Sequence, residues 1–391
     1  MSSTSINRFG LIRVFIFINA MLIIHACSEQ MNSNDISPQD NERITLKTFS
    51  NSFEMSDADV IEGLRWSLSF LGASLPSDSI GIKYDGNNKI SIDLTKLGFT
   101  DNALAAMKTI IKEIKTSESY IQNEHIDIGR FIVLTLNSSH HYYEITGVAK
   151  SLTEFRSKHQ FDQEVFVINS SVSKVDRIIE IAHYDNPNQI AYLCSEGMGS
   201  IAQGSFKVEE YETVEVMDNG QFKFALYGLD GQLKTAANSS LTNAGKPAKC
   251  LWCHETVVQP FFSTDPVLNT ESTLTKEEFT QIVNEQMGML SDYRKSLHSH
   301  IDFERKQNHS FAEFLYIDFM EPTVDRLMEE WSMTESEVNE LVRGLPTFSQ
   351  TESGLKGVFK RSDVDQRLHK EVLRVPYEAR EYSTYEPNFF N

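Results

Sequence analysis

Apolar residues in the first part of the chain recur at two spacings, one typical of helices and one typical of strands. Spacings of three and four residues predict amphipathic helices over 57–71, from Asp101 to Ile114, and over 127–136. An Asp-Gly-Asn-Asn turn at 85–88 separates two alternating runs within 82–94. Such a turn between alternating runs predicts a β-hairpin.

Short apolar runs then follow one another at strand length. They are 165–168, 178–181, 190–193, 213–217 and 222–229. The last two flank Asp218-Asn219-Gly220, which is a strong hairpin signal. We therefore predict an α+β domain over 43–246 whose second half is mainly antiparallel sheet.

After a polar loop at 238–247 the pattern becomes helical. Three capping boxes mark expected helix starts, namely Thr275 with Glu278, Ser310 with Glu313, and Thr334 with Glu337. The predicted fold class is therefore α+β, with the α+β domain followed by a small all-α, cytochrome c-like domain over 247–346. Residues 347–391 form a charged and then aromatic tail.

The start of the chain has the features of an export signal. Arg8 and Arg13 precede the apolar run 14–24, which is too short for a comfortable membrane span. Ile23-Ile24-His25-Ala26-Cys27 resembles the lipobox of bacterial lipoproteins. The resemblance implies a signal peptide over 1–26 and lipidation of Cys27, for instance with palmitate; a plain secretory signal or an N-terminal anchor is the alternative. The polar segment 27–42 is expected to be a tether.

Composition excludes one class of partner. Of 391 residues, 40% are hydrophobic and 23% charged, which is ordinary for a soluble globular protein of about two domains. The formal charge is −19, and it becomes −21 when residues 1–26 and their two arginines are removed. Nucleic-acid binding needs a basic surface, so no nucleic-acid partner is expected.

The main candidate for chemistry is Cys250-Leu251-Trp252-Cys253-His254. Cys-x-x-Cys-His is the attachment pattern of c-type haem, in which two thiols bond to the haem and the histidine binds its iron. A zinc site fits poorly, because Cys253 and His254 are neighbours and no second cysteine pair exists. A structural Cys250–Cys253 disulfide remains open, since an exported chain meets oxidising conditions.

The region after this motif resembles the small class I cytochromes c. Met320 follows His254 by 66 residues, is followed by Glu321-Pro322, and precedes a helix opened by Thr334. The resemblance implies one covalent haem c, with His254 as proximal and Met320 as distal iron ligand. It covers about a quarter of the chain, and the helix that the family has before the motif is missing. Met287, His298 and His300 are the alternative distal ligands. An iron without a distal ligand from the protein is the remaining alternative.

These features predict a lipoprotein held to a bacterial membrane through Cys27, with the outer membrane favoured. Its function would be single-electron transfer to a redox partner protein, as an electron carrier rather than an enzyme. The alternative is a binding or sensing lipoprotein in which the motif is a disulfide or the haem is a sensor. His140-His141-Tyr142-Tyr143, expected on a strand, and Gly197-Met198-Gly199 indicate no further site.

Overall fold

The structure is a computed structural model, and it describes residues 41–49, 53–168, 175–242, 245–254, 267–348, 357–368, 372–376 and 386–391. The predicted signal peptide, Cys27 and nearly all of the tether lie outside the described residues. Within the described part, Glu42–Asn391 forms one compact unit.

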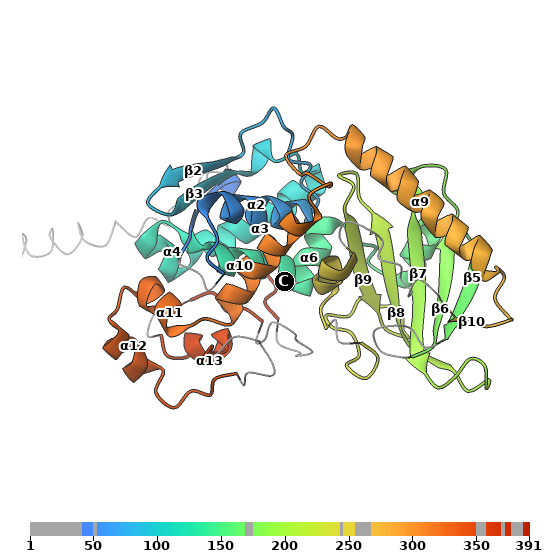
Figure 1. The fold of residues 1–391 in the computed structure, drawn as a ribbon. Helices are drawn as coiled ribbons and strands as arrows, with labels where there is room; N and C mark the ends of the chain where they lie inside the picture. Colours follow the sequence, from blue (N-terminus) through green and yellow to red (C-terminus); the bar gives the residue numbers. More distant parts are fainter. Residues whose placement is uncertain are drawn as a thin grey trace, which may run out of the picture. The chain divides into compact units, whose positions relative to one another are not determined.

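A four-stranded sheet of order β2-β3-β1-β4 comes from the first part of the chain (Figure 1). Its strands are β1 (Arg43–Lys47), β2 (Ile82–Gly86), β3 (Lys89–Asp93) and β4 (Ile126–Asp127). β2 and β3 form the predicted hairpin, in which Asn87 and Asn88 have φ of 52° and 58°. Asparagine tolerates this left-handed region better than most residues, which explains the turn. β1 pairs antiparallel with β3 and parallel with β4.

The predicted helices of this region are confirmed, with small changes at their ends. The elements are α2 (Asp57–Ser69), η2 (Leu94–Lys96), α3 (Asp101–Thr116), α4 (Glu118–Asn123), α5 (Ile128–Ile132), the π-helical η3 (Val133–Asn137), α6 (Ser139–Thr146) and α7 (Leu152–Lys158). Thr100 caps α3 by accepting the Ala103 N–H. The strand expected at 140–143 is wrong. That stretch is α6, because Ser138 caps it and Gly147 ends it in a left-handed conformation.

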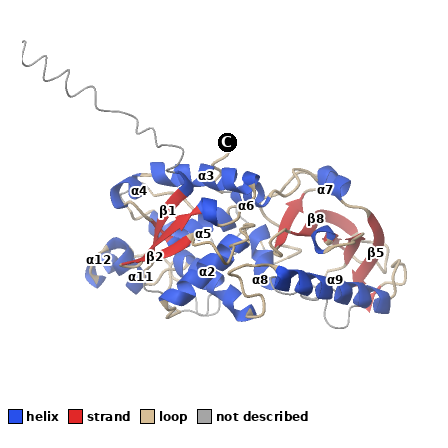
Figure 2. Cartoon of the chain, turned by 90° about the horizontal axis from the view of Figure 1, so that it is seen from above, coloured by secondary structure: helices blue, strands red, loops and turns tan. Residues whose placement is uncertain are grey.

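A six-stranded sheet of order β10-β5-β6-β7-β8-β9 follows, and it is antiparallel throughout. Its strands are β5 (Phe161–Ile168), β6 (Arg177–Ala182), β7 (Ala191–Met198), β8 (Lys207–Val216), β9 (Phe222–Tyr227) and β10 (Val267–Leu268), with η4 (Pro187–Gln189) between β6 and β7. The prediction of a mixed fold with mainly antiparallel sheet is confirmed. The helix α9 (Lys276–Ser296) lies along this sheet (Figures 1 and 2).

The remaining helices do not form a separate all-α domain in the described residues. They are η5 (Pro247–Lys249), α8 (Cys250–His254), η6 (Lys306–His309), α10 (Ser310–Met320), α11 (Val324–Trp331), α12 (Glu335–Leu341) and α13 (Arg361–Asp365). On α9, Gln286 accepts a hydrogen bond from Tyr192 of β7. α10 packs against α2 and α5. A cytochrome c-like domain of its own is therefore not confirmed.

Two glycines allow α10 to pack this closely. A Cβ on Gly63 would lie 2.8 Å from the backbone of Phe311, and a Cβ on Gly129 would overlap Phe319. The capping boxes at Thr275 and Thr334 are confirmed. The box at Ser310 is wrong: α10 follows η6 directly, so His309 occupies the cap position and makes no side-chain cap.

Candidate haem-attachment site

The Cys250–His254 motif folds as a single helical turn, α8, directly after the η5 turn. Backbone positions three and four apart lie on one side of such a turn. Position 250 therefore shares a side with positions 253 and 254, as attachment of one haem requires. The side chain of Cys253 is outside the described part of the structure.

Neighbouring residues hold α8 against the body of the protein. Leu251 is fully buried in the main core. The Trp252 ring lies 5.1 Å from the ring of Tyr316 on α10, and the Lys249 ammonium lies 5.6 Å from the same ring. α8 and η5 also contact β9. The motif is thus part of the packing between α10 and the six-stranded sheet.

Cys250 and His254 line a small cavity of about 50 Å³ against the six-stranded sheet. The other lining residues come from η5 and from strands β6 to β9: Arg177, Ile179, Tyr192, Cys194, Glu212, Thr213, Val214, Phe224, Ala225, Leu226 and Pro247. The His254 ring lies 5.8 Å from the ring of Phe224. Two thiols, an imidazole, a guanidinium and a carboxyl group therefore surround one space.

The imidazole of His254 is neutral at neutral pH. Burial, and then the positive charge of Arg177, lowers the pKa of His254 to about 4. A neutral imidazole is the form that binds a metal ion. Burial raises the pKa of the Cys194 thiol well above its usual range, so this thiol stays protonated. Cys194 is half-buried against the core and lines the cavity.

A cluster of carboxyl groups, which the sequence analysis missed, lies next to the cavity. Glu196 on β7 and Glu210 and Glu212 on β8 have oxygens within 4.8 Å of one another. Arg177 pairs with Glu196, and Lys234 pairs with Glu210. Burial, and then the charge of Glu212, raises the pKa of Glu196 to about 9. The signal was present, because residues two apart on a strand, such as Glu210 and Glu212, share a face.

The proposed distal ligands lie elsewhere in the described residues. Met320 ends α10, is 1% exposed and belongs to the main core. Met287 and His300 line a different surface cleft, beside α9. His298 and His300 follow the end of α9 and lie outside the helix. Among the described residues that line the cavity, His254 is the only histidine and there is no methionine.

The motif residues have the chemistry that covalent haem attachment requires, but the cavity is small for a haem. The helical turn and the neutral His254 suit two thioether bonds and an iron ligand. Pockets for drug-sized ligands have volumes of about 300–1,000 Å³, whereas this cavity has about 50 Å³. A porphyrin bonded to Cys250 would therefore lie outside this cavity, or would displace part of its lining.

Comparison with models of known protein families, with curated proteins and with solved structures finds no match to this chain. Within the described ranges, none of the helices has the length and apolar character needed to cross a bilayer.

Proposed function

We propose that the chain is a membrane-anchored lipoprotein that carries one covalent haem c and transfers single electrons. The observation that supports this most directly is the α8 turn, in which Cys250 and a neutral His254 face the same space. Bound haem would supply an iron that changes its charge by one electron. The chain's own residues would fix the position of that iron and its environment.

Each residue has a defined role in this proposal. Cys250 and Cys253 hold the haem, and His254 binds its iron through a ring nitrogen. Burial, and then the positive charge of Arg177, keeps the imidazole neutral. Met320 is the proposed distal ligand, and it would have to leave its core position or meet the haem from the side of α10. Cys27 carries the lipid that holds the protein to the membrane, beside a redox partner protein.

Spectroscopy after expression with a cytochrome c maturation system tests the haem. We expect a pyridine haemochrome typical of c-type haem, which stays with the denatured chain. Cys250→Ala and Cys253→Ala should each weaken or abolish covalent attachment. Cys194→Ala is the matched control, because it removes a thiol from the same cavity and should keep the haem. A chain without any haemochrome would refute the proposal.

The distal ligand and the lipid have separate tests. Met320→Leu roughly conserves the volume of a buried side chain, and it should remove the weak band at the red edge of the oxidised spectrum. A band that persists would assign the ligand to another methionine, such as Met287, whereas a wild-type spectrum without the band would assign it to His298, His300 or water. Cys27→Ser should abolish labelling by palmitate and release the protein from membranes; continued labelling would refute lipidation at Cys27.

The volume of the cavity favours a second candidate function. In it, Cys250 and Cys253 form a disulfide, and the chain is a binding or sensing lipoprotein. A disulfide needs no more space than the cavity provides. The mass of the exported chain separates the two functions: haem adds its own mass, whereas a disulfide lowers the mass by two hydrogen atoms and makes Cys250 unreactive until reduction.

A further inference from the structure

The segment Glu386–Asn391 docks on the N-terminal end of α6 (Figure 1). Ser138 donates its hydroxyl to the Pro387 carbonyl at 2.7 Å. The backbone N–H of Ser139 donates to the Glu386 carboxylate. A helix N-terminus favours a negative charge through its exposed N–H groups and its dipole. The start of α6 therefore recognises the acidic side chain of Glu386 and the backbone carbonyl of the next residue, Pro387.

His141 provides the second half of the docking surface. Its side chain is fully buried, and its Nδ1 lies 2.6 Å from the Leu134 carbonyl, which assigns the ring proton to Nδ1. Its Nε2 then accepts a hydrogen bond from the Phe389 N–H at 3.0 Å. The rings of His141 and Phe389 lie 4.5 Å apart, and Phe390 approaches the same ring at 5.7 Å.

A buried ion pair links this segment to the motif. Lys246 donates to Glu386 at 2.8 Å, and the two side chains are 0% and 1% exposed. Lys246 begins the turn into Cys250, because its carbonyl accepts the Lys249 N–H at 3.0 Å. Burying a lysine is costly unless it is paired. Removal of Glu386 would therefore move Lys246 toward water, and the turn before Cys250 would move with it.

We propose that Glu386–Asn391 is a latch: docked on α6, it fixes through Lys246 the loop that leads into Cys250–His254, and its release makes the half-buried Cys250 more accessible. If the chain carries haem, as proposed above, attachment to Cys250 precedes docking of the latch. The link to haem rests on that proposed function, whereas the latch itself does not.

Alkylation of Cys250 by iodoacetamide, followed by mass spectrometry, tests the latch. The full chain with Cys27→Ser is produced without haem and kept reduced. Glu386→Gln, and a chain that ends before Glu386, should each raise the alkylation rate of Cys250 by about tenfold or more, which corresponds to about 1.4 kcal/mol of lost protection. An acetylated Glu-Pro-Asn-Phe-Phe-Asn peptide, added at millimolar concentration to the shortened chain, should restore slow alkylation.

A control variant separates release of the latch from general destabilisation. Asp365→Asn breaks a different buried ion pair, with Arg130, whose side chains are 7% and 12% exposed. It should leave Cys250 slow to react. An unchanged rate in Glu386→Gln and in the shortened chain, equal acceleration in Asp365→Asn, or a peptide without effect would each overturn the latch. No haem is present in this assay, so the outcome is independent of haem attachment.

Discussion

Two buried networks of charged side chains have the same formal charge and opposite effects on their carboxyl groups. One lies on the six-stranded sheet and consists of Arg177 and Lys234 with Glu196, Glu210 and Glu212. The other joins α5, α10, α11 and α13 and consists of Arg130, Arg326 and Arg361 with Asp127, Asp318, Glu330 and Asp365. The formal charge of each network is −1, because the first has two cations and three acids and the second has three cations and four acids.

The difference lies in the arrangement of the charges. In the helix network Glu330 receives two hydrogen bonds from Arg361, at 2.8 and 2.9 Å, and also faces Arg326. These cations outweigh burial and lower the pKa of Glu330 to about 2. In the sheet cluster burial, and then the charge of Glu212 close by, raises the pKa of Glu196 instead. Glu330, which lies between cations, therefore stays ionised, whereas the shifts of Glu196 and Glu212 favour their protonated forms.

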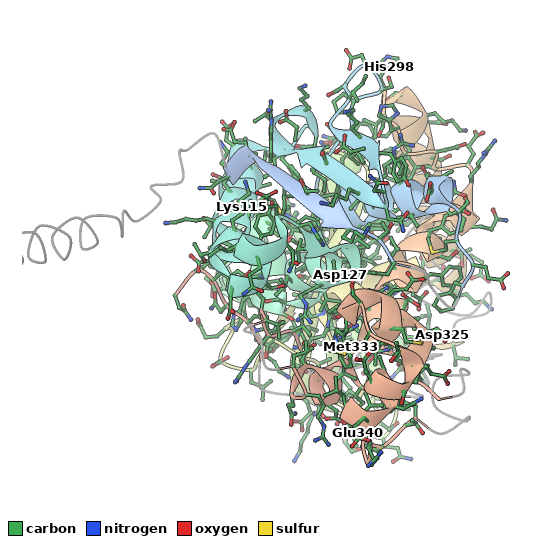
Figure 3. The ribbon with its side chains drawn as sticks, turned by 90° about the vertical axis from the view of Figure 1, so that its left-hand side faces the viewer. Lys115, Asp127, His298, Asp325, Met333 and Glu340 are labelled. Carbon is green, nitrogen blue, oxygen red and sulfur yellow. The ribbon has the colours of Figure 1, made fainter. Side chains whose placement is uncertain are left out.

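The positions of the networks give them different roles. Figure 3 shows Asp127 between the elements of the first sheet and α11, where it pairs with Arg326. The helix network therefore connects α11 and α13 to the rest of the protein. The hydrophobic cluster around Leu327 and Val338 is separate from the main core and does not provide this connection. The sheet cluster holds Arg177 beside His254, so it sets the electrostatic environment of the motif.

Removal of the central arginine of the helix network should have the largest effect. Arg326→Leu leaves Asp127 and Asp318 buried without their partner, and Arg326 is 4% exposed. We expect a loss of about 3–5 kcal/mol in the free energy of unfolding, measured by urea denaturation. Arg343→Leu is the control: its pair with Glu340 is 73% and 63% exposed and should contribute at most about 1 kcal/mol. Equal losses in the two variants would contradict the importance of burial.

Glu330→Gln should have a smaller effect that depends on pH. At pH 7 we expect a loss of about 2–4 kcal/mol, because the amide cannot pair with Arg361 and Arg326. The folded-state pKa of Glu330 is lowered to about 2, so its contribution is present above about pH 4.5 and is lost as pH falls toward 2. The unfolding free energies of wild type and variant should therefore converge in acid. A gap that stays constant down to pH 2 would contradict this.

Local signals predicted much of the fold, whereas the charge networks depend on distant pairs. The turns at 85–88 and 218–220 formed the expected hairpins, because turn chemistry acts over a few residues. Ser138 and Gly147 are typical helix boundary residues and are consistent with α6, whereas the His-Tyr stretch between them has the composition of a strand. The pairing of Arg130 with Asp365 joins residues 235 apart, and no local pattern contains it.

The candidate site was predicted in part. The motif predicted that Cys250 and His254 act together, because attachment of c-type haem requires a fixed spacing between them. The two residues do line one cavity. The sheet side of that cavity, with Arg177 and Glu196, required knowledge of strand register that short runs do not contain. The latch was missed for the same reason: Lys246 and Glu386 lie 140 residues apart. The prediction of Met320 as distal ligand stays untested.

Glu196→Gln should destabilise the fold least of these variants, and it has the opposite pH dependence to Glu330→Gln. The pKa of Glu196 is raised to about 9, so the folded state holds a proton that the unfolded chain releases near pH 4.5. The stabilising contribution of this proton is full below about pH 4.5 and is lost as pH rises toward 9. Below about pH 4.5 the group is neutral in both states, like glutamine, so we expect a change within about 1 kcal/mol there. At pH 7 the variant should be the more stable protein by up to about 3 kcal/mol, because its unfolded state gains no charge at this position.

Urea denaturation between pH 7 and 9 measures how the stabilities of wild type and Glu196→Gln depend on pH. His141 and His254 do not titrate in this range, because burial lowers the pKa of each to about 4. Wild-type stability should fall with pH by at most about 1.4 kcal/mol per unit, the limit for one proton. The Glu196→Gln curve should be flatter, because the amide releases no proton and no longer repels Glu212. Parallel curves would show that the cluster holds no proton. The contribution of Glu330, taken as the difference between wild type and Glu330→Gln, should grow as pH rises from 2, whereas the contribution of Glu196 should shrink as pH rises toward 9. These opposite dependences would establish that arrangement, and not formal charge, determines the ionisation of each network.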